Sequence, residues 1–328
     1  MAEVYDIYHD ESKEEAYWHG FLFVPRSERK CLLDLLTKSR KGINWYKPVS
    51  FKEINKRTGR GSPRVQLVES WLSIALASLQ QQKLLSLPVP FYLCGNPRCY
   101  IQRLDRLIRC KFVIFKEKDK HKKLFSGLDG LSCIETTFRM GIKGGIHCLF
   151  NDEEPITIGN VYIDGDEHYI RHFGRRFDVK RSLRRFAVER RSYVGFIFGA
   201  KLIPQRSDHR RIKSTQNVDD SQFLQLCDIL LGGIRFHSYC PDSRNIKYQI
   251  SLPCVSLLER DTNNRFRMKQ SRFFNSFTLG EAWLENDEWK FAQLKLGEDK
   301  AFPKVTQLQL PIYETKSRRI NREIKLNG

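Results

Sequence analysis

Residues 219–234 read Asp-Asp-Ser-Gln-Phe-Leu-Gln-Leu-Cys-Asp-Ile-Leu-Leu-Gly-Gly-Ile, and this stretch decides how the rest of the chain is interpreted. Its apolar residues surround most of the circumference of a helix, which predicts a buried helix. Asp219, followed three residues later by Gln222, predicts a capping-box-like start. Four small or polar residues recur at helical spacing and therefore share one narrow stripe: Ser221, Gln225, Asp228 and Gly232.

Asp228 stands out because an ionised carboxylate within an apolar helix is costly unless it is paired, hydrogen-bonded or bound to a metal. Two interpretations are open from this helix alone. One is an internal salt bridge or a hydrogen-bonded buried carboxyl group, and the other is a metal ligand. The choice depends on which other acidic residues the fold brings to the helix.

The charge of the chain points to a polyanionic partner. The 328 residues carry a formal net charge of +19, which favours nucleic acid over a membrane surface. A basic protein without such a partner is the simpler alternative. No apolar run is long enough to cross a bilayer, and the first residues do not resemble a signal peptide. The nine cysteines are irregularly spaced, as expected of reduced thiols, so we expect a cytoplasmic protein.

Two segments end in a carboxylate after an apolar run. Residues 3–9 and 16–24 read as an antiparallel hairpin whose first strand ends at Asp10, and residues 156–164 read as a central strand that ends at Asp164. Between and after them we expect a helix over 131–150, weakened by glycines, a helix over 178–190 and a strand over 193–203. The pattern becomes irregular after residue 240.

This order of elements is that of an RNase H-like domain. We therefore expect an α/β fold in which a mixed sheet is flanked by helices. Residues 1–240 would form this domain, with helices inserted near 40–130, and residues 241–328 would form a basic C-terminal extension. In such a domain Asp10, Asp164 and Asp228 converge. Carboxylates of this kind hold two divalent metals, Mg²⁺ or Mn²⁺, about 3.5–4 Å apart.

Three blocks of the sequence resemble a known family. Residues 8–12 read Tyr-His-Asp-Glu-Ser, residues 161–164 read Val-Tyr-Ile-Asp, and the third block runs from Ser221 to Gly232. Together they look like the uncharacterised prokaryotic family called domain of unknown function 3800, whose members are placed with RNase H-like and integrase-like folds. Its members often lie near mobile-element or phage-defence genes. The chain departs from the family pattern at Lys13 and at Cys227.

The resemblance implies Asp10, Asp164 and Asp228 as metal ligands and catalytic residues, with Glu11 and Gln225 close by. Glu11 would take part only if the first strand ended there, because neighbouring strand residues point to opposite faces. Ser221 and Gln225 would support the site, and Glu135 is a candidate for a helix-borne acid. His9, His168 and His209 are candidate proton shuttles, although ordinary packed or polar histidines are the simpler interpretation.

The residues predict a metal-dependent nuclease or a related phosphoryl-transfer enzyme, a two-metal phosphodiester hydrolase. The resemblance implies a role in phage defence or mobile-element biology. The alternative is a non-catalytic nucleic-acid-binding or assembly protein that keeps the fold. A weaker hypothesis is a defence effector gated by a protein partner. The densest basic cluster would hold the nucleic-acid backbone: Arg175, Arg176, Lys180, Arg181, Arg184 and Arg185.

Overall fold

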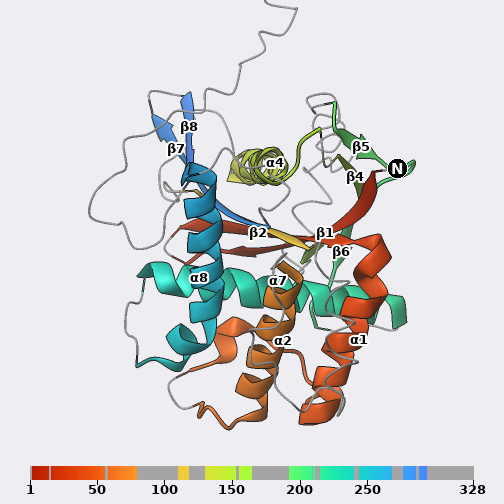
Figure 1. The fold of residues 1–328 in the computed structure, drawn as a ribbon, viewed down its shortest axis with the longest axis vertical. Helices are drawn as coiled ribbons and strands as arrows, with labels where there is room; N and C mark the ends of the chain where they lie inside the picture. Colours follow the sequence, from red (N-terminus) through yellow and green to blue (C-terminus); the bar gives the residue numbers. More distant parts are fainter. Residues whose placement is uncertain are drawn as a thin grey trace, which may run out of the picture.

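The protein folds around one mixed sheet with helices on both faces (Figure 1). The computed structural model describes residues 2–14, 16–55, 58–79, 110–117, 130–152, 155–164, 192–208, 210, 215–239, 244–267, 276–285 and 288–293. The expected α/β class is therefore confirmed for the part of the chain that is described.

The described elements span most of the sequence. The helices are α1 (Arg26–Ile43), the short 3₁₀ helix η1 (Phe51–Glu53), α2 (Pro63–Leu79), α4 (Gly130–Leu149), α7 (Thr215–Tyr239) and α8 (Ile246–Arg267). The strands are β1 (Glu3–Ser12), β2 (Tyr17–Pro25), β3 (Lys111–Glu117), β4 (Ile156–Asp164), β5 (Val194–Phe196), β6 (Leu202–Gln205), β7 (Phe277–Glu285) and β8 (Glu288–Gln293).

The strands lie in the order β5-β4-β1-β2-β3-β7-β8, and β6 pairs with β4 beyond the end of β5. β1, β2 and β3 are successively antiparallel, whereas β4 lies parallel to β1. α7 and three other helices, α1, α2 and α8, cover one face, and α4 covers the other (Figure 1). Because β1 and α7 are in contact at the middle of the molecule, carboxylates that point from either element into this layer meet there.

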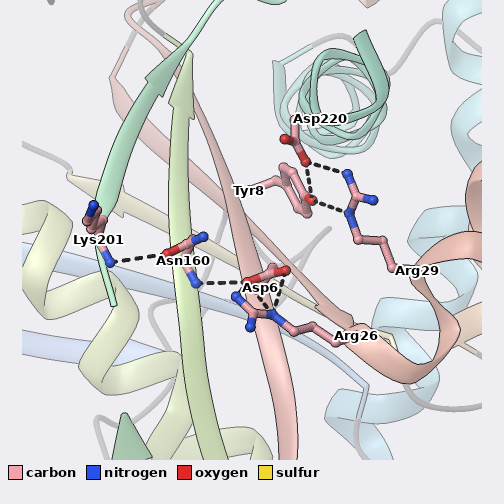
Figure 2. A network of polar contacts seen from close by, with 7 residues as sticks. All are labelled: Asp6, Tyr8, Arg26, Arg29, Asn160, Lys201 and Asp220. Carbon is pink, nitrogen blue, oxygen red and sulfur yellow. Dashed lines mark hydrogen bonds and ion pairs between the residues drawn. The ribbon is translucent and has the colours of Figure 1, made fainter. Parts of the chain in front are cut away.

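A bulge in β4 is held open by Asp6 of β1. The register between β1 and β4 slips between Tyr5 and Ile7, and the Asp6 carboxylate accepts the Asn160 N–H at 2.8 Å. Figure 2 shows the Arg26 guanidinium on the same carboxylate, with bonds of 2.8–3.1 Å. A Cβ at Gly159 would lie 2.3 Å from Asp6 Oδ1, so only glycine fits beside this ion pair.

α7 is fixed against β1 by a second polar group in the same layer. The Tyr8 hydroxyl donates to Asp220 Oδ1 at 2.8 Å, and Arg29 Nη2 donates to the same oxygen at 2.8 Å (Figure 2). Asp220 is nearly fully buried, and burial raises its pKa in spite of these partners. This contact fixes α7 against β1 at Tyr8, which lies two residues before Asp10.

Several boundaries differ from the prediction. β1 continues through Ser12 instead of ending at Asp10, and α7 begins at Thr215, so Asp219 lies inside the helix and is not a cap. The expected strand over 193–203 is two strands, β5 and β6, separated by a turn at Gly199 with φ of +76°. After residue 240, α8 packs on α7 and β7 pairs with β3 of the same sheet.

α4 runs unbroken through its glycines, although they were expected to weaken it. A Cβ at Gly141 would lie 2.6 Å from the Phe21 ring, and one at Gly145 would lie 2.5 Å from Val113. These glycines therefore let the helix lie close to the sheet. The predicted helix over 178–190 falls outside the described residues. None of the helices within the described ranges is both long and apolar enough to cross a membrane.

Candidate functional site

The three predicted carboxylates come from three different elements on the α7 side of the sheet. Asp10 lies in β1, Asp164 is the last residue of β4 beside it, and Asp228 lies in the middle of α7. Asp10 is buried, whereas Asp164 and Asp228 are partly exposed. Solvent therefore reaches Asp164 and Asp228 but not Asp10.

The pairing of His9 with Ile163 places Asp10 and Asp164 on neighbouring strands, and the charges of Asp164 and Asp228 both act on Asp10. Burial raises the pKa of the Asp10 carboxyl well above its usual range, and the negative charges of Asp228 and Asp164 raise it further. No arginine or lysine counts among the main causes of this shift. The charges that act on Asp10 come from other acids and repel its carboxylate. A bound cation would offset this repulsion.

Asp228 is held by the segment that follows α1. Its Oδ2 accepts the backbone N–H of Phe51 at 2.8 Å, and the Ser50 side chain also hydrogen-bonds it. Burial raises the pKa of Asp228, while these two bonds and the positive charges of Lys52 and Arg235 oppose the rise. Asp228 is thus hydrogen-bonded, as one of the two interpretations expected, and its side chain is partly exposed.

Asp164 is held by the segment after β6. Its Oδ1 accepts the backbone N–H of Ser207 at 3.2 Å. The pairing of Asp164 with Gln205 at the end of the β4–β6 ladder brings this segment alongside. Each of these two carboxylates therefore has its position set by a backbone N–H from a loop.

Two glycines allow α7 and its neighbours to approach the site closely. Gly20 is the β2 partner of Asp10, and a Cβ there would lie 3.2 Å from Leu231 and 3.4 Å from Cys227 Sγ. At Gly232 a Cβ would lie only 2.6 Å from the Phe51 Cβ. The absence of a side chain at Gly20 lets α7 pack close to Asp10. The absence of one at Gly232 lets η1 pack close to α7, so that the Phe51 N–H can donate to Asp228.

The predicted stripe on α7 is confirmed as one contact face. Ser221 and Gln225 both donate to the Ser207 carbonyl, at 2.6 Å each, and Gly232 packs against Phe51. The two predicted supporting residues thus contact the loops that hold the carboxylates.

Three cations lie near Asp228, and one of them, Arg235, forms an ion pair with Glu14. Lys52 follows Phe51 directly, and Arg235 lies two turns after Asp228 on α7. The Lys247 ammonium donates to the Lys52 carbonyl at 3.4 Å and lies 5.4 Å from the Phe51 ring centroid. Burial and the charge of Arg235 lower the pKa of Lys247, while the charges of Glu14 and Asp228 oppose this change.

Other predicted residues lie elsewhere. Because β1 continues to Ser12, Glu11 points away from Asp10, and its carboxylate contacts the Tyr17 hydroxyl and Lys13. His9 is buried on the α4 side, where its Nε2 lies 2.9 Å from His19 Nδ1. Glu135 belongs to α4, but its side chain is outside what is described. His168, His209 and the basic cluster of residues 175–185 also fall outside the described residues.

Sequence reasoning missed the backbone donors of Phe51 and Ser207 and the cations at Arg235 and Lys247. Residues 40–62, which include Lys52, carry a mixture of basic and aromatic side chains that fits either a nucleic-acid surface or a solvated insertion, and neither interpretation predicts contact with α7. No local pattern marks a backbone N–H as a carboxylate partner, so only the tertiary structure reveals these groups.

The donor chemistry of the three carboxylates fits a hard divalent cation, since all of the atoms offered are oxygens. Nevertheless, as the side chains stand, no three His, Cys, Asp or Glu residues in the described ranges are gathered closely enough to hold an ion. The three carboxylates are therefore close enough for their charges to act on Asp10, but they are not as close together as the ligands of one bound ion. Comparison with protein-family models, curated proteins and solved structures finds no significant match.

Proposed function

We propose that this protein is a metal-dependent phosphodiester hydrolase that acts on nucleic acid and has an RNase H-like core. The observation that carries the proposal is the placement of Asp10, which is buried and interacts electrostatically with Asp164 and Asp228. Three acids that are remote in sequence lie near enough to influence one another's charge, which is costly for stability and typical of a functional site.

The order of the strands supports the RNase H-like part of the proposal. An antiparallel β1–β2–β3 unit is followed by β4 alongside β1, then by β5 and β6, and then by the helix that carries the last acid. The three sequence blocks that resemble domain of unknown function 3800 fall on β1, on β4 and on α7. Within the described part, β7 and β8 extend this arrangement beyond β3.

In this proposal Asp10, Asp164 and Asp228 would hold Mg²⁺ or Mn²⁺. Such ions activate a water and stabilise the leaving oxygen of a phosphodiester. The backbone N–H groups of Phe51 and Ser207 keep two of the carboxylates oriented. A bound cation would stabilise the charged form of Asp10, whose pKa is raised by burial and by the neighbouring acids.

The cations near Asp228 support a phosphate-bearing substrate. Lys52 and Lys247 would attract a phosphate backbone to the carboxylates without reading its sequence, whereas Arg235 is paired with Glu14. Tyr46, 59% exposed in the loop before η1, offers a ring on which a base can stack. The predicted basic cluster of residues 175–185 remains part of the proposal as a further backbone-binding surface.

A specific observation favours the non-catalytic alternative. Asp228 already accepts bonds from Phe51 and Ser50, as a purely structural carboxylate would. In that case the acids would contribute to stability alone, and the cationic surface would serve binding.

The decisive experiment combines metal titration with cleavage of labelled DNA and RNA, single- and double-stranded. We expect the wild type to bind Mn²⁺ and to cleave at least one substrate. Asp164→Asn should lower cleavage by at least about 10³-fold with the fold intact, because an amide replaces the charged metal ligand. Chelation of the metal should have the same effect.

The control is Asp152→Asn, which alters an exposed carboxylate in the turn before β4 and should cleave as the wild type does. Cleavage at the wild-type level by Asp164→Asn, or a wild type that binds no divalent ion, would overturn the hydrolase proposal.

A further inference from the structure

We propose that Gln225 is a positioning residue of the candidate site, because its single side-chain amide holds together the two loops that orient Asp164 and Asp228. This inference rests on the proposed function only for its consequence in metal binding. The tethering itself is a property of the fold and is tested separately below.

The carbonyl oxygen of the Gln225 amide holds the segment between α1 and η1. Oε1 accepts the Val49 N–H at 3.0 Å and Arg40 Nη2 at 2.6 Å. Arg40 in turn donates to the Lys47 carbonyl at 2.7 Å, so both bonds act on the same segment. Two residues after Val49, the Phe51 N–H reaches Asp228.

The nitrogen of the same amide holds the segment after β6. Nε2 donates to the Ser207 carbonyl at 2.6 Å and to Ser221 Oγ at 3.1 Å. Ser221 Oγ itself donates to the Ser207 carbonyl at 2.6 Å, which doubles the tether. The N–H of Ser207 reaches Asp164 at 3.2 Å. The Gln225 amide therefore bonds Ser207, which carries one backbone donor of the site, and Val49, which lies two residues before the other donor, Phe51.

The hydrogen bonds around position 225 require a primary amide on a side chain as long as that of glutamine. Gln225 is only 2% exposed, so water does not replace a missing partner. The oxygen must accept two bonds while the nitrogen donates two, which neither a carboxylate nor an ammonium does. A glutamate would keep the bonds from Arg40 and Val49 but would set an oxygen against the Ser207 carbonyl.

Gln222 provides a matched control one turn earlier on α7. It is also buried, and its Oε1 also accepts from Arg40, through Nε at 3.2 Å. Its Nε2 donates to Thr37 Oγ1 of α1 at 3.4 Å and so does not act on either loop of the site. Gln222→Glu and Gln225→Glu thus add the same charge beside the same arginine, but only the second removes a tether.

The test measures hydrogen exchange at individual backbone amides in the two folded variants. We expect Gln225→Glu to speed exchange at Ser207 by at least about tenfold, because its carbonyl is released, and to speed it less at Phe51, whose Gln225 bonds remain. Gln222→Glu should leave both amides within about twofold of the wild type. In the same samples Mn²⁺ affinity should fall by about 10- to 100-fold for Gln225→Glu alone.

Unchanged exchange at Ser207 in folded Gln225→Glu would overturn the inference, and so would equal effects of the two variants. Where Gln225→Glu does not fold, Gln225→Asn keeps the amide but shortens its reach by one methylene, and the same outcomes decide. A wild type without divalent-ion binding would overturn the proposed function, while the exchange data would still decide the tethering.

Discussion

The backbone N–H of Phe51 donates a 2.8 Å hydrogen bond to Oδ2 of Asp228, which lies 177 positions further along the chain. This bond joins the first loop of the helical layer to the buried helix that carries the last acid of the candidate site. It exists because Gly232, one turn after Asp228, leaves room for the Phe51 side chain. The position of the Asp228 carboxylate therefore depends on the Phe51 loop and on the close packing at Gly232.

The first prediction separates a functional from a structural carboxylate within one strand. Asp10→Asn is expected to raise the free energy of unfolding of the metal-free protein at neutral pH, because it removes a carboxyl group whose pKa is raised on folding by burial and by two other acids. Asp6→Asn, four residues earlier on the same face, should lower it by about 1–3 kcal/mol, because the Arg26 ion pair is lost (Figure 2).

Urea unfolding at low ionic strength, without divalent ions, measures both variants. Mn²⁺ binding should be lost in Asp10→Asn and kept in Asp6→Asn. If Asp10→Asn is the less stable of the two, the three acids are structural and the non-catalytic alternative is correct.

The second prediction concerns the close approach at Gly232. Gly232→Ala should destabilise the protein by about 1–3 kcal/mol, because its Cβ would lie 2.6 Å from the Phe51 Cβ and would push η1 off α7. The control is Gly144→Ala in α4, where a Cβ meets nothing within 4 Å. That variant should be more stable by up to about 1 kcal/mol, owing to helix propensity. Equal unfolding midpoints for the two variants would contradict the packing argument.

The third prediction concerns a buried guanidinium. Arg40 is 5% exposed, lies 4.5 Å from the Trp71 ring centroid and donates to neutral oxygens of Lys47, Gln222 and Gln225. Arg40→Met keeps an apolar stem but removes these charged hydrogen bonds, so we expect a loss of about 2–4 kcal/mol of unfolding free energy. Lys41→Met, at the exposed neighbouring position, should change it by less than about 0.5 kcal/mol. A loss below about 1 kcal/mol for Arg40→Met would show that the guanidinium is dispensable.

The fourth prediction is a dependence of stability on pH. Burial, and to a lesser degree the charge of Lys13, lowers the pKa of His19 to about 3. His19 therefore stays neutral in the folded protein, while in the unfolded chain it takes up a proton below its ordinary pKa of 6.5. Stability is full above that pH and falls by up to about 1.4 kcal/mol per pH unit as the pH drops toward 3.

His19→Gln tests this dependence because an amide keeps hydrogen-bonding groups toward His9 and Thr137 without titrating. Its unfolding free energy, measured at several values between pH 6.5 and 4, should fall less steeply than that of the wild type. Parallel curves for the two proteins would mean that His19 is protonated in the folded state.

The sequence by itself determined the elements whose signals are local. The helical spacing of Ser221, Gln225, Asp228 and Gly232 placed them on one stripe, and the apolar run before Asp164 predicted a strand ending there. Both predictions are confirmed. Side-chain periodicity follows directly from backbone geometry, so a single segment is enough to show it.

Only the tertiary structure decided which residues contact the stripe of Ser221, Gln225, Asp228 and Gly232. The Phe51 and Ser207 backbone donors, the cation at Lys247 and the pairing of β7 with β3 come from segments far apart in the chain. A backbone N–H is the same in every residue but proline, so no sequence pattern marks the one that will reach a carboxylate. That choice depends on the close approaches at Gly20 and Gly232, which exist only when the helices and the sheet are packed together.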